Sequence, residues 1–119
     1  MMNATIETIF QDLTVDGVQI PVKFLRYNGN KTTYVTYMQQ DANGSYAGDD
    51  EILGFVGFYD FDVYSKSDYS KVIEQIKVKM KENGFVWQPN RDSQDMFEDD
   101  TGYYHKTLCF AIHEQILES

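Results

Sequence analysis

The chain has 119 residues, which is the size of one ordinary domain and is enough to bury a core without disulfides or a structural metal. Its formal net charge of −9 repels DNA, RNA and anionic membranes, and so excludes a conventional reader of duplex nucleic acid. Nine Tyr and eight Phe exclude a disordered chain and provide material for both a core and contact surfaces. We therefore expect a single domain over 1–119.

The sequence contains no feature that predicts export or membrane insertion. The N-terminus lacks a basic segment followed by an apolar run, and no stretch is apolar enough to span a bilayer, so we expect no signal peptide and no membrane partner. The one cysteine, Cys109, lies in an apolar run and is interpreted as a small buried hydrophobe. The lack of a cysteine framework favours a reducing compartment.

The first half of the chain predicts a short helix followed by strands. Apolar residues recur with helical spacing over 4–13. Alternation predicts a strand over 18–24, and Pro21 confines that strand to a sheet edge or a bulge. The β-branched and aromatic run 32–38 predicts the second strand of a hairpin. The polar segment 39–50 is interpreted either as a loop or as the tip of a longer hairpin.

The longest predicted strand covers 51–64. Aromatic residues occupy both of its faces at the start and only one face at the end, which is typical of a central strand that becomes one-sided. The clearest helix covers 68–83, with Ser67 or Asp68 as its N-terminal cap and Gly84 closing it in a left-handed conformation.

The remainder predicts two strands separated by a loop. A short strand is expected at 85–87, with Trp87 packed in the core under the last helical turn. A polar, acidic loop then leads to a closing strand over 103–113. The resulting fold class is α+β: one antiparallel sheet, with the long helix and the short N-terminal helix packed on it. The second face of the sheet must be covered by the first helix or by another subunit, and the aromatic residues favour a subunit.

Few residues suggest catalysis. Asp60 and Asp62 share a strand face, and with His105 they could form a metal or acid–base site if the last strand lies beside the long one. Solvated carboxylates and a hydrogen-bonded structural histidine are the favoured interpretations. The sequence has no nucleophile, metal-binding or phosphate-binding motif. We therefore expect a non-enzymatic protein without catalytic residues, metal site or cofactor.

Four segments carry a resemblance to a known family: Thr33–Tyr37, Gly48–Glu51, Tyr59–Lys66 and Phe97–Lys106. Together with the helix that ends at Gly84, they resemble the small head–tail completion and tail-terminator proteins of long-tailed bacteriophages and prophages, over about 21–110. The resemblance implies helices packed against a sheet. It also implies a ring of subunits, commonly six, that caps the tail tube or joins it to the head.

The resemblance also implies partners and a location. The partners are further copies of the chain and the phage tail-tube and connector proteins; the location is the cytoplasm of the bacterial host during assembly, and then the virion. DNA would pass nearby without tight binding, because an acidic ring releases no counterions from it. We expect apolar and aromatic burial to offset the repulsion between subunits.

The loops 39–50 and 88–101 are expected to become ordered on contact with neighbours. The residues expected to contact another copy or a partner are Tyr34, Tyr37, Tyr46, Asp49, Asp50, Phe97, Tyr103 and His105.

Two alternatives remain open at this stage. An acidic inhibitor or DNA mimic that binds a nucleic-acid enzyme is supported by the charge, the small size and the cluster Glu98–Asp100. A metal-dependent hydrolase would use Asp60, Asp62 and His105.

Overall fold

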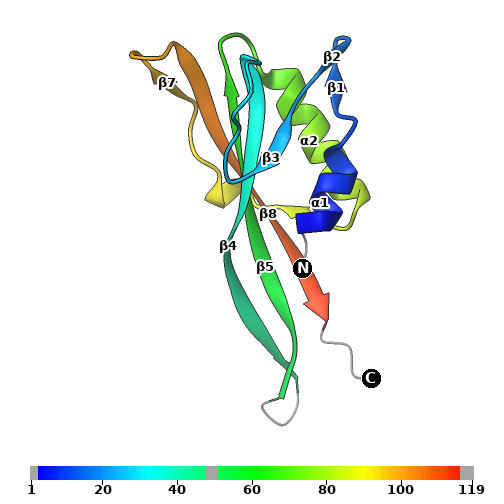
Figure 1. Cartoon of the computed structure of the whole chain (residues 1–119). Coiled ribbons are helices and arrows are strands. Elements are labelled where there is room, and N and C mark those ends of the chain that lie inside the picture. Colours follow the sequence, from blue (N-terminus) through cyan, green and yellow to red (C-terminus); the bar gives the residue numbers. More distant parts are fainter. Residues whose placement is uncertain (1–2, 48–50, 116–119) are drawn as a thin grey trace.

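The computed structural model describes residues 3–47 and 51–115 and has an α+β fold (Figure 1). Its elements are α1 (Asn3–Phe10), β1 (Thr14–Val15), β2 (Val18–Gln19), β3 (Val22–Phe24), β4 (Thr33–Ala47), β5 (Glu51–Ser65), α2 (Ser70–Glu82), β6 (Val86–Trp87), the 3-10 helix η1 (Pro89–Arg91), β7 (Met96–Glu98) and β8 (Tyr103–Gln115). The main sheet has the order β3-β4-β5-β8-β6, with β7 also paired to β8. Strands β1 and β2 form a separate small hairpin.

Helix α2 confirms the clearest helix predicted from the sequence. Its buried stripe consists of Val72, Ile73, Ile76 and Met80. The N-terminal cap position falls at Tyr69, and not at Ser67 or Asp68 as the sequence predicted. The carboxylate of Asp68 nevertheless accepts the backbone N–H of Ser70 at 2.9 Å, which satisfies one of the free donors of the first turn. Gly84 follows the helix with φ +86°, a conformation that glycine adopts without steric cost.

Both helices lie on the same face of the sheet, and the core lies between them and the strands. Phe61 of β5 is fully buried at its centre. The Phe61 ring lies 5.5 Å from that of Phe10 in α1, 5.6 Å from that of Tyr37 in β4 and 5.6 Å from that of Phe110 in β8. Because α1 shares this face with α2, the first helix does not cover the opposite face of the sheet.

Strand β5 has the central position in the sheet that the sequence predicted. It pairs antiparallel with β4 on one side and with β8 on the other. The segment 39–50 is the continuation of a long hairpin rather than a loop, as far as it is described, because β4 stays paired with β5 up to Ala47. Residues 48–50 lie outside the described part of the chain.

The hairpin predicted between 18–24 and 32–38 is wrong. The first segment breaks into β2 and β3 around Pro21, and β3 runs parallel to β4. Leu25, with φ +66°, turns the chain away directly after β3. The loop that follows then returns to the starting end of β3 before β4 begins. The sheet is therefore mixed, while the predicted edge position of the Pro21 strand is confirmed.

Two expectations for the segment after α2 also need correction. Trp87 is 39% exposed, so it does not pack in the core; the neighbouring Phe85 does, at 3% exposure. The segment 88–101 is not a plain loop, because it contains η1 and the short strand β7. Both corrections arise at the sheet edge, where β8 offers pairing positions that sequence periodicity does not indicate.

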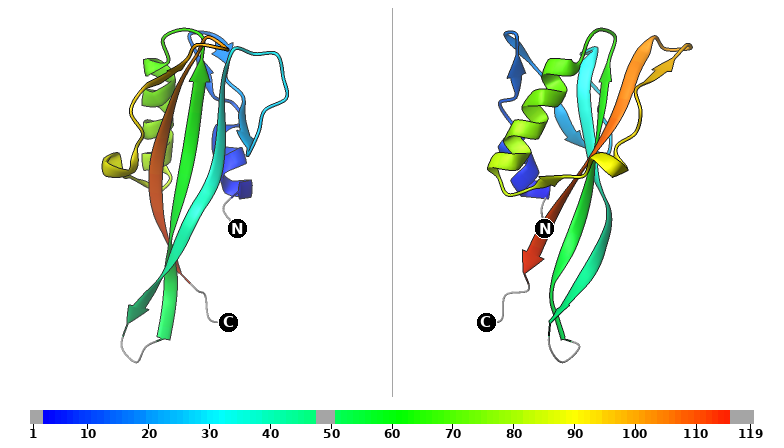
Figure 2. Two further views of the ribbon diagram at one scale, coloured as in Figure 1. Left: turned by 90° about the vertical axis from the view of Figure 1, so that its left-hand side faces the viewer. Right: turned by 180° about the vertical axis from the view of Figure 1, so that it is seen from behind.

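The molecule is elongated, with principal extents of 52 × 26 × 23 Å. Fifteen residues of strand span about 50 Å, so β4 and β5 account for its length. Their far halves, together with the end of β8, project beyond both helices (Figure 2). We call this projection, 38–47 of β4, 51–58 of β5 and 112–115 of β8, the arm. No helix of the described residues is long and apolar enough to cross a membrane.

Candidate functional site

The face of the sheet opposite the helices carries the most unusual side chains of the molecule. Strand alternation sends Val35 and Tyr37 toward the helices and Tyr34, Thr36 and Met38 to the opposite face. We call this opposite side the helix-free face. It is here that the structure brings together residues from β4, β5 and β8.

Four rings form a continuous stack across the helix-free face. Tyr34, Tyr64 and His105 lie directly opposite one another on β4, β5 and β8. The ring centroids are 4.9 Å apart for Tyr34 and Tyr64 and 4.2 Å apart for Tyr64 and His105. Tyr27, from the loop after β3, stacks on Tyr34 at 4.8 Å. We call these four residues the aromatic ladder; cross-strand pairs of this kind each stabilise a sheet by about 0.2–1 kcal/mol.

Tyr103 completes the edge of the ladder. Its ring meets those of Tyr34 and Tyr64 edge-on, at 5.8 and 6.4 Å. The ammonium of Lys66 lies 5.1 Å from the centre of the Tyr103 ring, within the range of a cation–π contact. The ladder therefore presents half-buried rings with polar tips, a composition typical of protein contact surfaces.

Asp62 links His105 of the ladder to Thr107, two residues further along β8. Its Oδ1 atom accepts a hydrogen bond from the Thr107 hydroxyl and lies 3.2 Å from Nε2 of His105. Burial raises the pKa of the Tyr64 hydroxyl to about 12, with a smaller contribution from the nearby Asp62 carboxylate. Burial also raises the pKa of Tyr34. Both phenols are therefore neutral hydrogen-bonding groups at physiological pH.

Cys109 lies on β8 two residues beyond Thr107 and is unreactive. Cys109 is fully buried, as the sequence predicted, and lies opposite Asp60 on β5. Burial, and secondly the Asp60 carboxylate, raise the pKa of the thiol to about 11. A thiol with this pKa is protonated near neutrality and is a poor nucleophile.

Arg91 of η1 ties the start of the arm to the body. Its guanidinium lies over the Phe58 ring at 4.0 Å from the ring centre and donates to Oε1 of Gln40 at 3.0 Å. The Arg91 side chain thus extends from beside β8 across β5 to β4. This contact holds η1 against the start of the arm.

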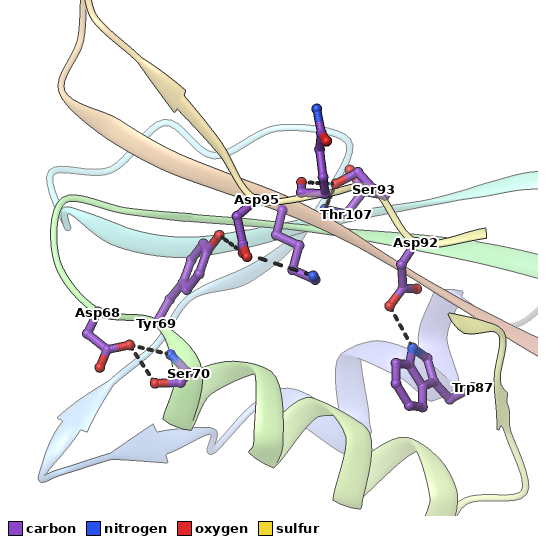
Figure 3. A network of polar contacts seen from close by, with 10 residues as sticks. Asp68, Tyr69, Ser70, Trp87, Asp92, Ser93, Asp95 and Thr107 are labelled. Atoms are coloured by element: carbon purple, nitrogen blue, oxygen red, sulfur yellow. Dashed lines mark hydrogen bonds and ion pairs between the residues drawn. The ribbon is translucent and has the colours of Figure 1, made fainter. Parts of the chain in front are cut away.

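A hollow lies on the helix side, between the start of α2, the residue before β7 and strand β8. It has a volume of about 790 Å³ and is lined by Lys66, Ser67, Asp68, Tyr69, Ser70, Ile73, Glu74, Lys77, Asp95, Tyr104 and Lys106. The Tyr69 hydroxyl donates to Asp95, and Lys106 Nζ lies 4.0 Å from the same carboxylate (Figure 3). Burial, and secondly this hydrogen bond, raise the pKa of Tyr69. Three lysines and three carboxylates line the hollow, so it favours neither sign of ligand.

The polar contacts around Trp87 account for its exposed position. Its indole N–H donates to Asp92 at 2.8 Å (Figure 3). The second oxygen of Asp92 accepts the backbone N–H of Cys109 at 2.9 Å. Lys77 lies 3.7 Å from the centre of the Trp87 ring. These contacts hold the 88–95 segment against the edge of β8.

The predicted contact residues have different outcomes. Tyr34, Tyr103 and His105 come together at the aromatic ladder, and Phe97, 51% exposed, packs on Tyr104 in the adjacent strand pair. Tyr37 is fully buried in the core, so its side chain is not available to a partner, because alternation points it toward the helices. Three predictions fall outside the described residues or side chains: Tyr46, Asp49 and Asp50.

Sequence reasoning did not select Tyr27 and Tyr64 as contact residues. Strand alternation places Tyr64 on the face opposite Phe61, and this placement could have identified Tyr64 as a contact residue. Tyr27 gave no signal, since it lies in a loop that only the tertiary structure folds back onto β4.

The structure does not form the metal site considered from the sequence. Among residues 3–47 and 51–115, no group of three or more His, Cys, Asp and Glu side chains could hold a metal ion. Asp62 pairs with His105, whereas Asp60 lies one row further along, facing Cys109. The three residues therefore lie in three successive cross-strand pairs of β5 and β8 on one face of the sheet.

No protein-family model matches this chain, and no curated protein matches it significantly in sequence. The function is therefore argued from its surfaces.

Proposed function

We propose that the chain is a non-enzymatic structural protein of a tailed bacteriophage or prophage. In this proposal it associates with copies of itself into a closed ring at the end of the tail or at the head–tail junction. It would assemble in the cytoplasm of the bacterial host and remain in the virion, in contact with tail-tube and connector proteins. The proposal combines the family resemblance with the properties of the helix-free face.

The observation that carries the proposal is the aromatic ladder on a sheet face that neither helix covers. Half-buried tyrosines offer large apolar area at a low cost in side-chain entropy, and they suit a surface that a second protein covers. Met38, which lies on the same face in β4, is 39% exposed. Such burial would offset the repulsion between subunits of net charge −9.

The acidic charge fits a ring through which DNA passes. Each phosphate that a protein neutralises releases counterions and adds affinity, so a basic channel would retain the genome. A ring built from chains of net charge −9 would let it slide.

Sedimentation velocity over a series of concentrations, alone and with tail-tube protein, tests self-association. We expect an assembly of closed symmetry, and a chain that stays monomeric under all these conditions would refute the proposal. A matched pair of variants tests the face: Tyr34→Ala removes a ring of the ladder, whereas Val18→Ala shortens an exposed side chain of the β1–β2 hairpin. Only the first should weaken assembly.

Electron microscopy of particles made without this protein separates the two positions. Overlong or irregular tubes indicate tail termination, whereas complete heads and tails that remain unjoined indicate head completion. Normal particles in full number would contradict both roles.

A further inference from the structure

The charge of this chain is concentrated in two segments, 32–65 and 107–119. They contain none of the ten Lys and Arg residues and eight of the 19 Asp and Glu residues. The rest of the chain holds the other eleven acidic residues and all ten basic ones, and so is nearly neutral. The strands of the arm lie within these two segments and carry Asp41, Glu51 and Glu114 without any Lys or Arg, so the arm is acidic.

The arm also has two open strand edges. Strand β3 pairs with β4 only over 35–37, and β6 pairs with β8 only at 110 and 111. Within the described residues, no strand pairs with the outer edge of β4 after Tyr37 or with that of β8 after Ala111. Open edges present unpaired N–H and C=O groups, which another strand can satisfy.

The opposite charge lies at the edge of the body. Residues 17–40 contain Lys23, Arg26 and Lys31 and no acidic residue. Strand β3 is the first strand of the sheet, so its outer edge also has no strand partner among the described residues. Phe24 and Leu25 are 40% and 58% exposed beside these cations. We call residues 22–31 the basic edge.

We infer that the acidic arm of one copy docks on the basic edge of the next copy, with an open strand edge of the arm beside β3. This inference rests on the proposed self-association and adds a second contact to the one proposed for the helix-free face. Pairing two arms would place like charges together, which is unfavourable, whereas arm and basic edge are complementary. Because the two surfaces differ, the contact is head-to-tail. It generates a ring when the rotations that relate successive copies add up to a full turn.

A charge-reversal variant tests the contact in the full chain. We expect Lys23→Glu with Arg26→Glu to weaken assembly about a hundredfold, because like charges at an interface cost several kcal/mol. The control is Lys79→Glu with Lys81→Glu, which makes the same change in net charge on α2 and should assemble as the wild type does. Equal assembly of the two variants, with native circular dichroism, overturns the inference.

Complementary variants test the pairing directly. Asp41→Lys with Glu51→Lys reverses charge in the arm and should also prevent assembly. Mixing this protein with the Lys23→Glu, Arg26→Glu protein restores attraction in both directions, so we expect assemblies to form again. Two folded variants that stay dissociated when mixed contradict the pairing.

Cross-linking of the wild type gives an answer that needs no variant to fold. Light and heavy isotope-labelled chains are mixed, assembled and treated with a zero-length carbodiimide. Peptides that join Lys23 or Lys31 of one chain to Asp41, Glu51 or Glu114 of another support the inference. Intermolecular links found only between other sites overturn it.

The outcomes also separate the two proposals. If the wild type never assembles, with or without tube protein, the proposed function and this inference fail together. If the wild type assembles and the basic-edge variant assembles equally well, only the docking inference fails.

Discussion

At the scale of single residues, Phe61 and Phe97 illustrate the two uses of the aromatic excess. Phe61 is fully buried and contacts rings from α1, β4 and β8, so it joins three elements of the core. Phe97 lies on β7, about half exposed, with one aromatic neighbour. Composition alone counts them equally, although their contributions to stability differ greatly.

Phe61→Ala should lower the free energy of unfolding by about 3–5 kcal/mol, because it removes a large buried side chain and leaves a cavity. Phe97→Ala is the matched control and should change stability by about 0.5 kcal/mol or less. Urea unfolding followed by circular dichroism measures both. Similar losses for the two variants would contradict the assignment of Phe61 to the centre of the core.

Tyr64 makes folding sensitive to alkaline pH. Its pKa is about 12 in the folded chain, against about 10 in an unfolded one. The folded state therefore holds more protons in that window. The stabilisation is complete below pH about 10 and is lost as the pH rises toward 12.

Tyr64→Phe should make the decline in unfolding free energy between pH about 10 and 12 shallower, because it removes one titrating group. Part of the decline should remain, since burial also raises the pKa of Tyr37 to about 12. Urea unfolding at a series of pH values measures the slope, and both proteins should have parallel profiles below pH about 9. An unchanged slope above pH 10 would show that Tyr64 does not contribute.

At the scale of elements, α2 is specified almost entirely by its own sequence. The apolar stripe lies within the helix, and the Asp68 carboxylate and Gly84 each lie within two residues of one of its ends. The backbone N–H of Phe85 donates to the carbonyl of Met80 at 3.0 Å, closing the last turn around the glycine.

Gly84→Ala should destabilise the chain by about 1–2 kcal/mol, because a residue with a Cβ is strained at φ +86°. A Cβ at this position would meet no atom within 4 Å, so the loss would reflect backbone conformation and not a clash. Gly84→Asn should cost less, since asparagine tolerates this conformation. Thermal unfolding ranks the three proteins, and an alanine variant as stable as the wild type would contradict the left-handed turn.

At the scale of the whole molecule, the arm is separated from the helices that cover the core. The core lies between the helices and the near half of the sheet, whereas the acidic arm extends beyond them. The body can therefore remain folded while the arm interacts with another protein. This separation resembles that of a folded module with a docking extension.

Replacing residues 42–57 by Asn-Gly should shorten the hairpin without disrupting the body. Asp41 and Phe58 are opposite each other on β4 and β5, so a two-residue turn can join them. The removed strands project beyond both helices, so the melting temperature should fall by only a few degrees. Self-association should be lost.

Differential scanning calorimetry and light scattering on the same samples measure both effects. A body that unfolds without the arm would show that the two parts are not separable. A shortened protein that still assembles would place the contact elsewhere.

The sequence by itself determined the features that depend on neighbours along the chain. The 3.6-residue stripe and the glycine after it fixed α2, and two-residue alternation placed Phe61 and Tyr64 on opposite faces of β5. The burial of Cys109 followed from its apolar run. In each case the physical signal, periodicity or a local backbone preference, lies within a few residues of the position that it specifies.

Only the tertiary structure decided how distant segments meet. Val22–Phe24 has the pattern of a strand in either direction, and its parallel pairing with β4 depends on how the 25–32 loop returns. The position of α1 beside α2, which leaves the aromatic ladder uncovered by a helix, depends on the packing of Phe10 against Phe61. The ladder itself needs the register of three strands, and register is a long-range property that periodicity does not encode.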